Sequence, residues 1–171
     1  MKAAGVFVAL VIALLFQTTL GGVSLEAGTR VNFVLIAVVY VALAFGAMTG
    51  LLAGMVGGLA QDSLAGGIIG IGGISKTLIG FLVGVLGAQF IVSQPIPRFV
   101  MFVSASVLQE LCFQSLYALV EGHGIRFHYA AVLTQAAVNG MVGILAFQIT
   151  EMVPGLMQKR DTRMSLGRRR Y

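Results

Sequence analysis

Three ionisable residues, Asp62, Lys76 and Glu110, stand in otherwise apolar stretches and are the groups best suited to chemistry. A charged side chain costs about 2.5–3.5 kcal/mol at the centre of a membrane helix, so it normally faces protein or water and has a partner. Asp62 and Lys76 flank a glycine-rich segment. We expect them to form a salt bridge that pins this segment, and the alternative is an outward-facing site for a partner protein or a ligand.

Glu110 lies in the middle of an apolar stretch, and Gln114 follows four residues later, on the same face of a helix. The simplest interpretation is a hydrogen-bonded carboxyl group that fixes helix packing. We therefore expect Lys76, Glu110 and Gln114 to be buried polar groups. A proton or cation pathway is the competing interpretation, which would make the protein a transporter or a channel. A pathway of this kind usually contains more than one ionisable group, and only one carboxylate is present here.

No arrangement of residues predicts catalysis or a cofactor. His123 and His128 share a short loop, without cysteine or paired carboxylates at a metal-ligand spacing. The run 73–77 lacks the first glycine of a Walker-type phosphate loop, which argues against an ATPase. Cys112 is the single cysteine, so no internal disulfide or thiolate metal site is available. We expect no enzyme activity and no catalytic, cofactor-binding or metal-binding residues.

Glycines recur at every fourth position in a segment that runs into Asp62. They are Gly46, Gly50, Gly54 and Gly58. On a helix this spacing aligns them along one face. Each glycine costs about 1 kcal/mol relative to alanine in a helix interior, so another backbone must pack closely against them. That backbone belongs either to a helix of the same chain or to a partner protein. Gly80 and Gly84, again four residues apart, are the internal candidates.

The composition is that of an integral membrane protein. Hydrophobic residues make up 58% of the 171 residues, charged residues make up 10%, and the mean hydropathy is +0.97. Six of the eleven cations lie in the last thirteen residues. A basic tail beside a membrane segment marks topology and favours contact with anionic lipid, so we do not expect nucleic-acid binding.

Six apolar segments predict an all-α protein with six transmembrane helices. They cover residues 3–20, 33–45, 50–61, 75–93, 99–120 and 129–150. Residues 46–49 are expected to form a tight turn, and the glycine-rich residues 66–73 a loop at membrane depth. We expect Ser75 to cap the fourth helix, and Pro95 and Pro97 to close it.

Pro154 is expected to end the regular structure. It divides the chain into a six-helix transmembrane domain, 1–154, and a basic cytoplasmic tail, 155–171. Lys2, Arg98 and the tail together hold eight of the eleven cations. Positive residues favour the inner side of a membrane, so we expect a multi-pass protein of the inner membrane with both termini in the cytoplasm.

Two segments resemble a known family, the rod-shape-determining membrane protein MreD. Residues 49–62, TGLLAGMVGGLAQD, resemble its G-x-x-x-G-x-x-x-G-L-x-x-D element, and residues 72–84, GGISKTLIGFLVG, resemble its loop and glycine-bearing helix. The length, the six apolar segments and the basic tail are similar too. Lys76 departs from the family pattern, where an apolar or small residue is expected. The residues that fall on the core motif are Gly50, Gly54, Gly58 and Asp62.

The resemblance implies a non-enzymatic scaffold of the bacterial cell-elongation machinery. Such a protein binds an MreC-like membrane protein and, through it, RodA, a penicillin-binding transpeptidase and MreB, and helps to maintain rod shape and peripheral peptidoglycan synthesis. The resemblance also implies a fold similar to the substrate-binding components of energy-coupling-factor transporters. A vitamin-binding component of such a transporter is therefore the alternative function.

Overall fold

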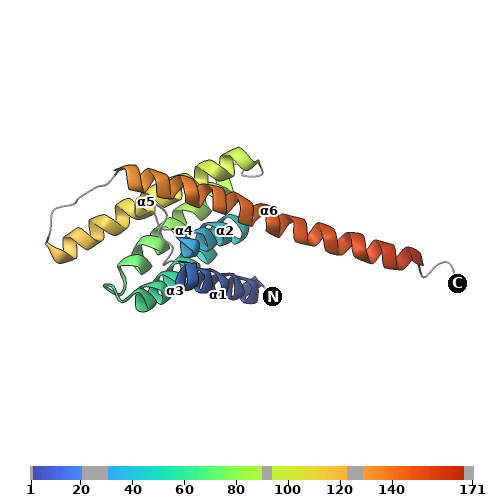
Figure 1. The fold of residues 1–171 in the computed structure, drawn as a ribbon, viewed down its shortest axis with the longest axis horizontal. Helices are drawn as coiled ribbons and strands as arrows, with labels where there is room; N and C mark the ends of the chain where they lie inside the picture. Colours follow the sequence, from blue (N-terminus) through green and yellow to red (C-terminus); the bar gives the residue numbers. More distant parts are fainter. Residues whose placement is uncertain (1, 21–30, 90–93, 123–128, 168–171) are drawn as a thin grey trace.

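The computed structural model describes residues 2–20, 31–89, 94–122 and 129–167, and confirms an all-α fold for them. The helices are α1 (Lys2–Leu20), α2 (Phe33–Phe45), α3 (Ala47–Ala65), α4 (Ile71–Gln89), α5 (Pro95–Glu121) and α6 (Tyr129–Gly167). Each helix packs beside the next along the chain, so that they form one bundle (Figure 1).

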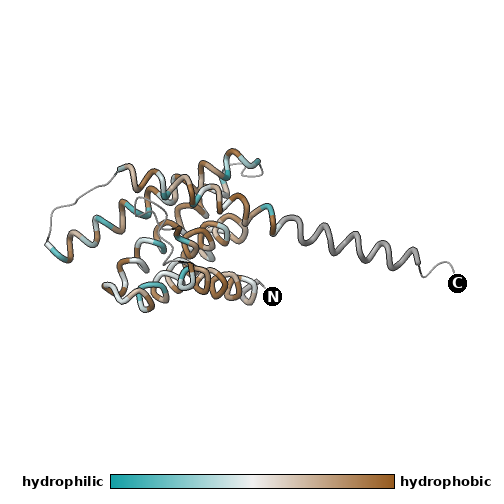
Figure 2. Tube along the Cα trace, viewed as in Figure 1, coloured by the Kyte–Doolittle hydropathy of each residue, from teal (hydrophilic) through white to brown (hydrophobic). Residues whose placement is uncertain are grey.

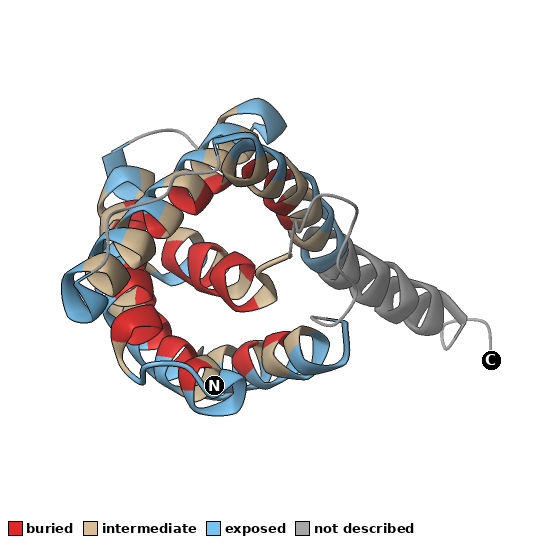
Figure 3. Cartoon of the chain, turned by 60° about the vertical axis from the view of Figure 1, so that its left-hand side comes forward, coloured by how far each residue is buried: buried red, intermediate tan, exposed pale blue. Residues whose placement is uncertain are grey.

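The second helix, α2, is the centre of the bundle. It contacts all five other helices, and seven of its thirteen residues are buried. Its sequence is apolar on every side, which is the pattern of a helix enclosed by protein. The other helices surround it in the order α1, α3, α4, α5 and α6, and α1 does not contact α6 (Figure 3). In the described part of the chain, the ring is therefore open between α1 and α6.

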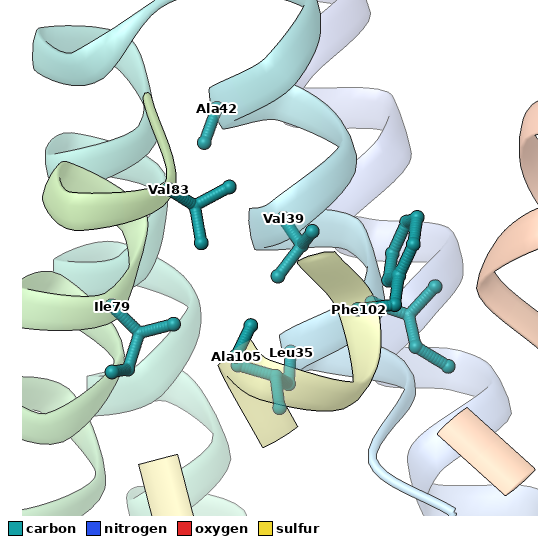
Figure 4. Packing of buried hydrophobic residues seen from close by; sticks show 8 residues of the cluster. Leu35, Val39, Ala42, Ile79, Val83, Phe102 and Ala105 are labelled. Carbon is teal, nitrogen blue, oxygen red and sulfur yellow. The ribbon is translucent and has the colours of Figure 1, made fainter. Parts of the chain in front are cut away.

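Two hydrophobic clusters hold the helices around α2. The main cluster joins α2 to α4 and α5, and its largest member is the fully buried Phe102 (Figure 4). A second cluster joins α2 to α1 and α3, where Leu10 packs near Ala53 and the valines of α2. The buried residues of the main cluster are Leu35, Ile36, Val39, Ala42, Ile79, Val83, Phe102 and Ala105.

Three of the described helices are long and apolar enough to cross a membrane: α4, α5, and α6 as far as Thr150. Helices α1 and α2 are apolar but shorter. Hydrophobic residues predominate along the helices of the bundle (Figure 2). Many of their side chains are exposed, such as Phe7 at 66% and Leu133 at 62%. So extensive an exposed apolar surface fits contact with lipid.

The bounds of α2 match the predicted helix over 33–45. Asn32 caps its first turn, because the side-chain oxygen accepts a backbone N–H at 3.0 Å. Gly46 ends it with a φ of +90°, in the left-handed region that favours glycine. The predicted turn over 46–49 is wrong, since α3 begins at Ala47 and Gly46 alone joins the two helices.

The connection between α3 and α4 comprises residues 66–70, which is shorter than the predicted loop over 66–73. The prediction that Ser75 caps α4 is also wrong. The helix begins four residues earlier, at Ile71, and the Ser75 hydroxyl donates a hydrogen bond of 3.1 Å to the Gly72 carbonyl inside it. The cap of α4 comes from another helix, as described below.

The prolines act differently from the prediction. Pro95 and Pro97 lie in the first turn of α5 instead of closing α4. Proline is accepted there because the first N–H groups of a helix have no acceptor within it. Helix α6 continues from Tyr129 through Pro154 to Gly167, so Pro154 does not end the regular structure.

Candidate functional site

The glycine stripe of α3 (Gly50, Gly54 and Gly58) packs against α4 of the same chain. All three glycines are buried. A methyl group added to Gly50 would lie 2.5 Å from the Gly80 carbonyl oxygen, and one added to Gly58 would lie 2.6 Å from the Gly72 carbonyl oxygen. Because carbon and oxygen atoms do not approach so closely, the two helices are in backbone contact along the stripe.

The matching residues on α4 are also small at both ends of the contact. At one end, Gly84 meets the backbone of Ala47 and Gly80 meets the backbone of Gly50, and at the other end Gly72 lies against Gly58. Between these ends, Gly54 lies against the backbone of Lys76. This register makes α3 and α4 antiparallel and leaves no room for another helix between them. A partner helix must therefore bind elsewhere on the molecule.

Asp62 supplies the cap of α4. One of its carboxylate oxygens accepts the backbone N–H groups of Gly70 and Gly72 at 2.9 Å and of Gly73 at 3.2 Å. The first N–H groups of a helix have no acceptor within it, and a carboxylate also interacts favourably with the positive end of the helix dipole. Asp62 is 8% exposed. Its carboxylate therefore fixes the geometry of the connection between α3 and α4.

The predicted salt bridge between Asp62 and Lys76 is not formed: in the described ranges, no ion pair joins the two side chains. Asp62 is engaged with the backbone of α4, as shown above. The charges of Asp62 and Glu110 still act on the Lys76 ammonium, so the three ionisable groups lie near one another. Lys76 is 2% exposed, as expected for a buried polar group.

Asp62, Lys76 and Glu110 line one polar pocket of about 530 Å³. Residues of α1, α3, α4, α5 and α6, and of the segment just before α2, contribute to its wall. Gln17 of α1 and Gln135 of α6 are among the lining residues. The sequence placed the three ionisable groups on separate segments and did not predict that they share a cavity.

A network of uncharged polar side chains holds the start of α2 at this pocket. The backbone N–H of Asn32 donates to the Asn139 side chain at 3.0 Å, and Asn139 donates to the Ser106 hydroxyl at 3.2 Å. Gln17 accepts from the backbone of Phe33 at 2.8 Å. Sequence analysis missed these residues, although a fully buried polar residue such as Asn139 requires hydrogen-bond partners.

Glu110 and Gln114 are paired as their spacing predicts. The Gln114 side chain donates to a Glu110 carboxylate oxygen at 2.7 Å. Both side chains are half-buried, which is less than expected for buried polar groups. The neighbouring Gln109 is the buried residue, with 2% exposure, and it also lines the pocket. His123 and His128 lie outside the described residues.

An all-helical chain with an apolar exterior, a helix pair in backbone contact and a buried polar pocket defines a helical membrane protein. Its sequence assigns the family. The chain belongs to the rod shape-determining protein MreD family, whose family model matches residues 1–159. It is therefore a rod-shape-determining membrane protein. No curated relative and no solved structure matches the chain. The alternative of a vitamin-transporter component gains no support from these comparisons.

We predict that Gly54→Ala destabilises the protein, because the added methyl group would collide with the backbone of Lys76 and Thr77. The expected loss in the free energy of unfolding is about 1–3 kcal/mol, measured by denaturant titration in detergent micelles. Gly5→Ala is the matched control, since nothing lies within 4 Å of its added methyl group. Equal stability of the two variants would contradict the backbone contact.

We predict that Asp62→Ala opens the first turn of α4. Loss of a helix cap costs about 0.5–2 kcal/mol, which corresponds to about 2- to 30-fold faster amide exchange over residues 70–73. Hydrogen-exchange mass spectrometry measures this directly. Ser63→Ala is the control, because Ser63 is exposed and its hydroxyl bonds only within α3. Unchanged exchange in the Asp62 variant would show that its carboxylate does not cap α4.

Proposed function

We propose that the protein is a non-enzymatic scaffold of the bacterial cell-elongation machinery. It binds an MreC-like membrane protein and through it serves RodA, a penicillin-binding transpeptidase and MreB. In this role it maintains rod shape and peripheral peptidoglycan synthesis. The observation that carries the proposal is the family match over residues 1–159.

We propose further that all six helices cross the inner membrane, with both termini in the cytoplasm. The distribution of cations supports this orientation, and Arg98 at the start of α5 is its anchor. The Arg98 guanidinium lies 3.9 Å from the centre of the Phe147 ring, and Phe147 contacts Tyr40 edge-on with the ring centres 5.0 Å apart. Arginine and aromatic side chains gather in this way where helices leave the membrane.

The partner helix is proposed to lie in an apolar groove between α1 and α3. The groove encloses about 680 Å³, and Phe7, Leu10, Leu52 and Val56 are among its lining residues. Three of them, Phe7, Leu52 and Val56, are at least half exposed. In a membrane, helices associate through close packing more than through hydrophobicity, so a shaped groove favours a helix over mobile lipid chains. The glycine stripe is already occupied by α4.

We predict that Leu52→Trp reduces the amount of MreC-like protein that co-purifies from membranes, because the larger side chain fills the groove. The expected loss is about tenfold, which corresponds to about 1.4 kcal/mol of binding free energy. Cells that depend on this variant should become round.

Leu133→Trp is the control for this prediction, since Leu133 is a similarly exposed leucine on α6, outside the groove. It should leave both partner recovery and cell shape unchanged. Full partner recovery with Leu52→Trp, or equal loss with both variants, would refute the groove as the partner site.

A further inference from the structure

Lys76 has no acceptor for its ammonium group in the described part of the chain. The side chain is 2% exposed and lines the polar pocket, and it forms neither a hydrogen bond nor an ion pair there. An ammonium group needs acceptors when it leaves bulk water, and an unpaired buried charge is strongly destabilising. Within the described residues these acceptors are missing, and a molecule bound in the pocket can supply them.

The nearby carboxylates already have other partners. Asp62 accepts three backbone N–H groups of the α4 turn, and Glu110 accepts from Gln114. Their negative charges favour the charged ammonium, but neither carboxylate forms a hydrogen bond or an ion pair with Lys76. The N–H groups of Lys76 remain available to an occupant.

A second polar group at the pocket lacks a partner. The side-chain oxygen of Gln61, on α3, is buried and accepts no hydrogen bond. A buried acceptor of this kind costs about 1–3 kcal/mol if it stays unpaired. Gln61 lines the same pocket as Lys76, so one occupant can satisfy both. It would bring an acceptor to Lys76 and an N–H or O–H donor to Gln61.

We propose that this pocket binds a small organic acid, whose carboxylate or phosphate group accepts hydrogen bonds from Lys76 and whose N–H or O–H group donates to Gln61. The volume of about 530 Å³ lies within the usual range of about 300–1,000 Å³ for small-molecule sites. Nine of the fourteen lining residues are polar, which disfavours a lipid chain or an apolar partner helix as the occupant. The proposal does not rest on the scaffold role.

The test uses the full chain in lipid nanodiscs and measures the thermal midpoint with three probes: L-glutamate, glycerol 3-phosphate and glycerol. A ligand that binds the folded state raises the midpoint. At least one of the two acids should raise it for the wild type, and the acid that does so tells carboxylate from phosphate. Glycerol, which lacks an acidic group, should not.

Lys76→Met should abolish the response to the acid, while Lys2→Met, the same change at the start of α1, should keep it. Without ligand, Lys76→Met should be at least as stable as the wild type, because it removes an unpaired buried charge. Native mass spectrometry of protein taken from cell membranes should find a small acid on the wild type and none on Lys76→Met.

Three results would overturn the proposal. The first is a wild type that responds to neither acid and carries no small molecule in native mass spectrometry, which means that the pocket holds water or a partner's side chain. The second is an equal response of the wild type and Lys76→Met. The third is a lower ligand-free midpoint for Lys76→Met, which would assign Lys76 to a structural ion pair. Partner co-purification is measured separately, so failure here is distinct from failure of the scaffold role.

Discussion

Backbone contact between α3 and α4 is the constraint on which the rest of the structure depends. Three glycines on α3 let the chain of α4 approach until main-chain atoms touch, and Asp62 at the end of the stripe holds the first turn of α4 by its N–H groups. The glycines lower intrinsic helix stability, and close packing offsets that loss. Any side chain at Gly54 would separate the two helices at their midpoint.

The contact between α3 and α4 also determines which surfaces of the bundle are left for a pocket or for a partner. The backbone of Lys76 lies against Gly54, while its side chain lines the polar pocket beside the opening between α1 and α6. The helix pair therefore forms one wall of the pocket. A change in the packing of α3 against α4 would also change this wall. Because α4 occupies the stripe, the proposed partner surface lies elsewhere, in the apolar groove between α1 and α3.

Local signals in the sequence predicted part of the fold. The α2 bounds were predictable because Asn32 and Gly46 are strong start and stop residues, and the four-residue spacing of Gly80 and Gly84 pointed to α4 as the packing partner. The cap of α4 was not predictable, because Asp62 reaches it from another helix and displaces the local candidate Ser75. Proline was ambiguous, since it can end one helix or begin the next.

The polar pocket was the least predictable feature. Gln17, Asn32, Gln109 and Gln135 line it from four different segments and form no sequence pattern, so only the packing of the bundle brings them together. The salt bridge expected between Asp62 and Lys76 was inferred only from their charges and their proximity in the sequence, and it is not formed. Backbone N–H groups compete for the carboxylate, and sequence patterns do not reveal them.

The most direct test of the central claim is the distance between spin labels on Met55 of α3 and Ile74 of α4, which line one exterior groove. It is measured by pulsed electron paramagnetic resonance in a Cys112→Ser background, with and without the proposed MreC-like partner. Backbone contact predicts one short distance that the partner does not change. An increase of about 8–10 Å with the partner, the spacing of one inserted helix, would contradict it.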